Sequence, residues 1–159
     1  MRVFSIAVAG FLVSLAACSP PSSQSFDPDD PAVAAAIESL MAEAVKAADA
    51  VDPIGVLEPL GASEELTLIT GDVMLTGRQI IQEAFADTYD GLLEQNHTTL
   101  EKKTRLLSPD VALYTAIAEG TYTDKAGWTS EPVGLAISVI FVRENGNWVA
   151  RHVHQSIAQ

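Results

Sequence analysis

The last apolar stretch of the chain constrains the fold most, because it predicts a β-hairpin with a defined strand register. Asn145-Gly146 suits the positive φ angles of a tight two-residue hairpin turn. Apolar segments at 135–143 and 148–156 flank this turn. The register that such a turn imposes pairs Arg143 with Trp148, Phe141 with Ala150, Val139 with His152, and Ile137 with His154.

This register divides the hairpin into two faces, since side chains alternate along a strand. One face is apolar and ends in two imidazoles; it contains Leu135, Ile137, Val139, Phe141, Trp148, Ala150, His152, His154 and Ser156. Burying this face removes more apolar area from water than burying the other, so we expect it on the concave, helix-covered side of the sheet. His152, His154 and Trp148 would then point into the molecule. A β-bulge, which adds one residue to one strand, would reassign the faces.

Helical spacing of apolar residues places the helices before most of the strands. A helix is predicted from Pro31 to about Val51, with Asp30 as its cap and proline at its first position. A short second helix is expected at 53–57, and a third begins near Arg78. The chain therefore starts with about three helices.

From His97 onward the apolar period changes to two, which predicts strands. Strands are expected at 97–108, at 111–123 and up to Arg143, and a small hairpin at 64–76 precedes the third helix. Helices followed by a run of antiparallel strands form an α+β layout.

The first residues predict export of the protein. A charged start, an apolar run and small residues before a cut site make residues 1–17 a signal peptide. Leu15-Ala16-Ala17-Cys18 is similar to a bacterial lipobox, in which the cysteine is acylated; an ordinary signal cut near Ala17 is the alternative. We expect a lipidated Cys18 and a flexible tether at 18–30, followed by one domain at 31–159.

The predicted lipid determines where the protein would reside. It would hold the domain in the periplasm as the only contact with a membrane, and Ser19 after the cysteine, in place of aspartate, favours the outer membrane. Cys18 is the only cysteine, so the fold cannot rest on a disulfide. A formal net charge of −12 leaves no basic patch, so nucleic acid is not expected as a partner.

Two motifs resemble the nuclear transport factor 2-like (NTF2-like) superfamily. The closing pattern Trp-x-x-x-His-x-His-x-Ser at 148–156 and Gly-Arg-x-x-Ile at 77–81 are similar to SnoaL-like and DUF4440-type domains. The resemblance implies a cone, in which about three N-terminal helices wrap a curved, mixed or antiparallel sheet around a pocket. Arg78 is expected to anchor the loop before it rather than to bind a substrate.

A homodimer is expected through the open face of the sheet. Large apolar patches usually meet a partner, and members of the superfamily commonly dimerise this way. The predicted patch consists of Ile140, Val142, Val149 and Val153.

The ending also resembles the association domain of calcium/calmodulin-dependent kinase II. That domain binds carboxylate ligands through arginines on its central strands. Matched from the shared tryptophan, those places are held here by Val139, Gln155 and Ala118. The departure argues against the same ligand and the same oligomer-regulating role.

His152 and His154 lie two residues apart on one strand, so both imidazoles could meet one metal ion or one ligand. A metal would need further ligands, and nothing in the spacing brings His97, Asp110 or Glu119 close. We therefore expect structural or ligand-lining histidines and no metal or other cofactor.

Two functions from different classes remain. The favoured one is a non-catalytic binding or accessory module for a small apolar or amphipathic molecule, with His152, His154, Trp148, Val139 and Phe141 as the lining. The alternative is a small isomerase, dehydratase or hydrolase with a histidine base. Its candidate groups are His152, His154, Tyr114 and Glu119, but strand alternation puts Tyr114 and Glu119 on opposite faces, so no catalytic set assembles.

Overall fold

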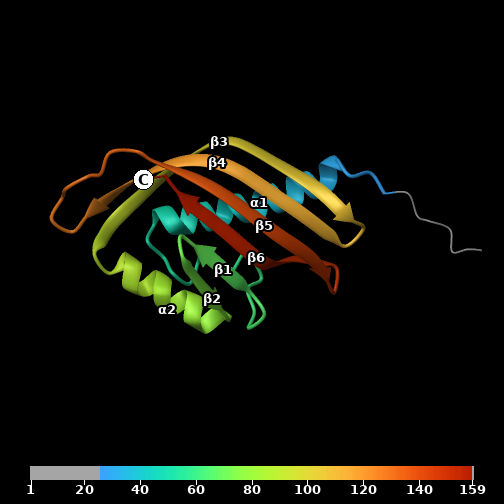
Figure 1. Ribbon diagram of the computed structural model, residues 1–159, viewed down its shortest axis with the longest axis horizontal. Helices are drawn as coiled ribbons and strands as arrows, with labels where there is room; N and C mark the ends of the chain where they lie inside the picture. The colour runs from blue at the N-terminus through green and yellow to red at the C-terminus, as the bar shows by residue number, and fades with distance from the viewer. Residues whose placement is uncertain (1–25, 159) are drawn as a thin grey trace, which may run out of the picture.

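Two helices and a curved six-stranded sheet make up residues 26–158, the part of the chain that the computed structural model describes (Figure 1). The predicted signal peptide, Cys18 and most of the tether lie outside these residues. Neither of the two helices is long and apolar enough to cross a membrane. In chain order the elements are α1 (Pro31–Asp49), β1 (Thr67–Thr70), β2 (Val73–Thr76), α2 (Arg78–Tyr89), β3 (Leu92–Ser108), β4 (Val111–Asp124), β5 (Val133–Glu144) and β6 (Asn147–Ile157).

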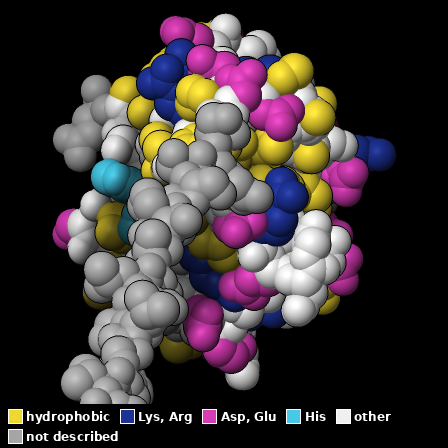
Figure 2. Space-filling model, turned by 90° about the vertical axis from the view of Figure 1, so that its right-hand side faces the viewer, with side chains coloured by type: hydrophobic (Ala, Val, Ile, Leu, Met, Phe, Trp, Pro, Cys, Tyr) yellow, Lys and Arg dark blue, Asp and Glu magenta, His cyan; other side chains and the backbone are white. Residues whose placement is uncertain are grey.

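The sheet has the strand order β2-β1-β6-β5-β4-β3. All neighbours are antiparallel except β1 and β6, which run parallel, so the sheet is mixed and the α+β prediction is confirmed. The three longest strands, β3 to β5, form a bent surface with α1 behind it, while α2 lies beside the short β1–β2 hairpin (Figure 1). At the end where the β3–β4 and β5–β6 hairpins turn, Lys and Arg side chains lie among Asp and Glu side chains (Figure 2).

Helix α1 forms as its sequence predicts. The Asp30 carboxylate accepts hydrogen bonds from the backbone N–H groups of Ala32 and Val33, and Pro31 occupies the first turn. An N-terminal carboxylate satisfies donors that the helix itself cannot pair. One face of the helix is buried against the concave side of the sheet, through Val33, Ile37, Met41 and Ala44.

The short second helix expected at 53–57 is absent from the described chain, where residues 50–61 form a series of turns. Val51 has a positive φ of 49°, which ends α1 sharply. The bonds that follow mix two spacings: Val56 donates to Asp52, but Leu57 donates to Ile54. Gly55 also disfavours a regular helix. The prediction of about three helices was therefore wrong.

The core fills one end of the concave face. Phe141 and Val139 of β5 and Ile37 of α1 are 0% exposed, and Leu57, Leu66 and Ile81 are almost as deeply buried. Buried side chains from both helices, the turn segment and the central strands thus meet in one cluster. This packing fixes α1 against the sheet at the end where the β5–β6 hairpin turns.

The predicted register of that hairpin holds next to the turn and fails beyond it. Phe141 pairs with Ala150 as expected, but the next pair is Ile140 with His152, so β6 carries Arg151 as an extra residue. Such a bulge reverses the alternation of every following side chain. The prediction that His152 and His154 lie on the concave side was therefore wrong.

Both histidines lie instead on the convex side of the sheet, which we call the open face. Strand pairing assigns to it Leu113, Thr115, Ile117, Ser138, Ile140, Val142, Val149, His152 and His154.

Contacts of Arg151 explain the position of the bulge. Its guanidinium group donates hydrogen bonds to the hydroxyl of Ser63 (2.7 Å) and to the carboxylate of Glu144. A third contact joins its Nε to the Glu65 carboxylate at 3.4 Å. These partners lie before β1 and at the end of β5, on either side of β6. The extra residue therefore directs one cation toward polar groups on both neighbours of β6, the segment before β1 and the end of β5.

Candidate functional site

A cavity of about 390 Å³ lies at the end of the concave face away from the core, between the sheet and α2. The strands contribute residues from the start of β3 and β5 and from the end of β4 and β6. Most of the lining is apolar, as is usual for small-molecule sites. Its apolar side chains include Leu68, Leu75, Phe85, Val133, Leu135 and Ile157, and its polar ones include Tyr89, Gln95, His97, Tyr122 and Gln155.

A histidine–carboxylate pair stands at one wall of this cavity. The Nδ1 atom of His97 lies 2.7 Å from a carboxylate oxygen of Asp49, and the backbone N–H of His97 donates to the same oxygen at 3.1 Å. Asp49 is the last residue of α1, so the helix that carries the core also orients this imidazole. The side chain of His97 is only 18% exposed.

The contact with Asp49 defines which nitrogen of a neutral His97 carries the proton. A carboxylate only accepts hydrogen bonds, so Nδ1 is the protonated nitrogen and Nε2 keeps a free lone pair. No described residue gives Nε2 a hydrogen bond, and the imidazole lines the cavity. The ring can therefore accept a hydrogen bond, or a proton, from a molecule in the cavity.

Gly120 makes room for this imidazole. It pairs with His97 across β3 and β4, and a Cβ atom at this position would lie 2.9 Å from Cδ2 and 3.3 Å from Nε2 of His97. A glycine inside a strand often marks such a close approach. Any larger residue here would push the ring away from its present place.

Tyr89 and Gln95 form the adjacent wall. The amide of Gln95 donates a hydrogen bond to the carbonyl of Ala48 at 3.0 Å, which ties β3 to the end of α1. Burial raises the pKa of the Tyr89 phenol above its usual value, a Gln95 hydrogen bond opposes this, and the charges of Asp49 and Asp52 add to the rise. The phenol therefore stays neutral, and the local field disfavours negative charge.

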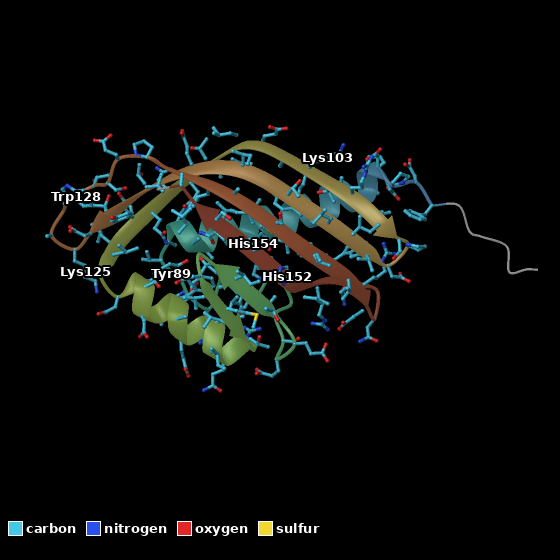
Figure 3. All side chains as sticks on the ribbon, viewed as in Figure 1. Tyr89, Lys103, Lys125, Trp128, His152 and His154 are labelled. Atoms are coloured by element: carbon cyan, nitrogen blue, oxygen red, sulfur yellow. The ribbon has the colours of Figure 1, made fainter. Side chains whose placement is uncertain are left out.

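The residues predicted as ligand lining do not border this cavity. Val139 and Phe141 belong to the packed core, and Trp148 is half-buried with the Arg143 guanidinium 4.6 Å from its ring centre. His152 and His154 project from β6 on the open face, whereas Tyr89 projects from α2 beneath the sheet (Figure 3). The bulge at Arg151 is the reason, because it turns both imidazoles outward.

Tyr114 and Glu119 lie on opposite faces of β4, and neither borders the cavity. Tyr114 is 4% exposed within the core, where burial raises the pKa of its phenol and nearby Lys102 opposes the rise. Glu119 is exposed on the convex side, opposite Gly134. The four groups named as catalytic candidates therefore do not meet in one place.

The guanidinium of Arg78 donates a hydrogen bond to the backbone carbonyl of Ala62 at 3.3 Å, so Arg78 contacts the loop before β1. Among the described residues, no cluster of three or more histidine, cysteine, aspartate or glutamate side chains could hold a metal ion.

Pairing of His97 with Asp49 is the feature that sequence reasoning missed. The two residues are 48 positions apart, and His97 was considered only as a metal ligand. One signal was available, namely Gly120 in the middle of an otherwise regular strand pattern. It indicated that a bulky group approaches the backbone there.

The fold belongs to the nuclear transport factor 2-like class. A nuclear transport factor 2 superfamily protein from Salmonella enterica superposes with a TM-score of 0.71 at 18% identity, covering 79% of this chain and 90% of that one. A ketosteroid isomerase-like protein from Erwinia carotovora gives 0.66 at 19% identity, with 79% and 95% covered. The association domain of the Caenorhabditis elegans kinase gives 0.63 at 18%, also with 79% and 95% covered.

The chain belongs to the calcium/calmodulin dependent protein kinase II association domain family, which matches residues 46–159. The match begins near the end of α1 and includes the whole sheet. A comparison with curated proteins gave no match. The structural likenesses are all below 25% identity, so they establish the fold alone.

Proposed function

We propose that this domain binds a small, mostly apolar molecule in the cavity between α2 and the sheet. The observation that carries the proposal is an apolar cavity of about 390 Å³ with an oriented imidazole in its wall. Apolar lining supplies binding energy, while a few placed polar groups fix orientation. The binding module favoured from the sequence is thus retained, but with a different set of lining residues.

Filling the cavity from α2 tests this proposal. Ala84 lines the cavity, whereas Ala86 on the same helix is exposed and outside it. Ala84→Trp should abolish the fluorescence that the neutral probe N-phenylnaphthylamine gains on binding, while Ala86→Trp should preserve it. Equal probe binding by both variants, with unchanged circular dichroism, would exclude the cavity as the binding site.

Asp49 and His97 also favour a second candidate function, general-base catalysis by an isomerase, dehydratase or hydrolase. A base held by an orienting carboxylate at a cavity wall is the arrangement that proton abstraction requires. His97 takes the role that the sequence gave to His152 or His154. The wild type should accelerate deuterium exchange at the carbon beside the carbonyl of tetralone, and His97→Gln should not. An exchange rate equal to that of buffer would leave the protein as a binder only.

We infer a lipid-anchored periplasmic location from the lipobox-like segment ending at Cys18. The end of the predicted tether contacts the domain, since the backbone N–H of Leu106 donates to the Pro28 carbonyl at 2.8 Å. About ten residues then separate the anchor from the domain, a reach of roughly 35 Å when extended. Mass spectrometry of native protein should find a diacylated or triacylated Cys18 at the N-terminus; an unmodified start elsewhere would exclude the anchor.

A homodimer through the open face is our proposal for assembly. Ile140, Val142 and Val149 remain on this face, next to Leu113 and the half-exposed Ile117. Val153 is excluded, since the bulge turns it toward the core. Ile140→Glu should halve the mass measured by light scattering at tens of micromolar, whereas Glu119→Gln, a change outside the apolar patch, should not. A monomeric wild type would end the proposal.

A further inference from the structure

The charges near the cavity are of one sign. No lysine or arginine is among the cavity-lining residues of the described chain. Asp49 stands directly behind His97, and the negative charges of Asp49 and Asp52 act on the neighbouring Tyr89 phenol. A second negative charge placed in this cavity would lose its hydration and meet no cation in exchange, which is unfavourable.

The hydrogen-bonding role of His97 also disfavours a negatively charged ligand. With Nδ1 committed to Asp49, Nε2 is the acceptor that this cavity-lining imidazole keeps. A carboxylate is also only an acceptor, so the two cannot form a hydrogen bond. A hydroxyl group can donate to Nε2 while its hydrocarbon part contacts the apolar lining.

We infer that the cavity selects neutral ligands with a hydroxyl group over carboxylates of the same shape, because His97 presents an acceptor and the wall holds no cation. This inference rests on the proposed binding function and names its ligand class. Phenols, enols and alcohols with a compact apolar skeleton are the expected ligands.

Three naphthalene derivatives substituted at the same ring carbon test the inference. Calorimetric titration of the full domain would compare naphthol, naphthoate and methylnaphthalene. Naphthol should bind about threefold to tenfold more tightly than methylnaphthalene, as one net hydrogen bond allows. Naphthoate should bind most weakly of the three.

Asp49→Asn provides a variant with a reversed expectation. In the place of the Asp49 oxygen, the asparagine amide nitrogen would donate to Nδ1 at the loss of the bond from the backbone N–H of His97, and the ring proton would then move to Nε2 and make it a donor. The preference for naphthol over naphthoate should then shrink or invert, while methylnaphthalene binding changes little. A merely structural role of Asp49 would lower the affinity for all three ligands alike.

Gly120→Ala is a second variant that keeps both polar side chains. Its methyl group would stand 2.9 Å from the His97 ring and displace it, so the naphthol preference should be lost. Gly134→Ala is the matched control on β5, because its Cβ would lie 3.4 Å from Ala158, an ordinary contact.

The outcomes separate the two proposals. Naphthoate binding as tightly as naphthol to the wild type overturns the inference while leaving the cavity a binding site. Failure of all three ligands to bind overturns the binding function and the inference together. An unchanged naphthol preference in Asp49→Asn and Gly120→Ala shows that His97 is not the selecting group.

Discussion

The concave face of the sheet is packed with side chains at one end and lines a cavity at the other. Toward the β5–β6 turn, Phe141 and Val139 are fully buried against Ile37 of α1. Toward the other end of the sheet, Leu135 of β5 and Gln155 of β6 border the cavity. One end is filled by side chains of the chain itself, and the other leaves space for another molecule.

The packed end is expected to provide most of the stability of the domain, and the end with the cavity is expected to bind the ligand. Close-packed side chains supply most of the stability of a small domain, while polar groups at a cavity wall add little to it. Asp49 connects the two regions, because α1 packs in the filled end and its last residue orients His97 at the hollow end. The packing of α1 in the filled end can therefore hold the imidazole of His97 in place at the hollow end.

The largest expected effect is a cavity made in the filled end. Phe141→Ala should lower the free energy of unfolding by about 3–5 kcal/mol, because it removes a fully buried ring. Leu135→Ala at the hollow end removes a half-buried side chain next to existing space and should cost about 1 kcal/mol. Urea denaturation of both variants measures the contrast, and equal losses would contradict the division into two ends.

A smaller effect is expected at Trp148, at the outer edge of the filled end. The ring is half-buried and stacks against the Arg143 guanidinium, so Trp148→Ala should cost about 1–2 kcal/mol rather than the full value for a buried aromatic residue. Thermal melting of Trp148→Ala beside Phe141→Ala checks this order. A reversed order would place the centre of the core nearer the hairpin turn.

The smallest effect concerns two tyrosines, one at each end. Burial raises the pKa of both Tyr114 and Tyr89 above 10, so each phenol stabilises the fold in its neutral form. That contribution is complete below about pH 10, the unfolded pKa, and is lost as the pH rises through the raised folded pKa. Ultraviolet titration with bound methylnaphthalene, which does not ionise, should delay ionisation of Tyr89 alone. Tyr89→Phe should remove that shift, while Tyr114→Phe should retain it.

Much of this fold was predictable because its signals are local. The cap at Asp30, the helix that follows it, and the turn at Asn145-Gly146 depend on residues within a few positions of one another. The α+β order of elements and the resemblance of residues 148–156 to the superfamily were sufficient to predict the fold. The missing helix at 53–57 shows the limit, since Asp52-Pro53 predicts a helix start and the Asp52 carboxylate does accept from Ile54 and Gly55, but the segment continues as turns.

Sequence reasoning could not find the site, because its groups meet through distant contacts. A bulge at Arg151 depends on Ser63 and Glu65, which lie more than eighty residues earlier in the chain. Strand alternation carries no information about such partners, so the two histidines of β6 were assigned to the wrong face. His97 and Asp49 likewise meet only when α1 lies across β3.

Parallel pairing of β1 with β6 imposes an order on folding. Thr67 to Thr70 align with His152 to Gln155, so the β1–β2 hairpin has no place in the sheet until its last strand has been synthesised. Contacts of such large sequence separation form late and slowly. Until then the edge of β1 is unpaired and open to other chains. A nascent chain therefore passes through a stage in which the β1–β2 hairpin can pair with another chain.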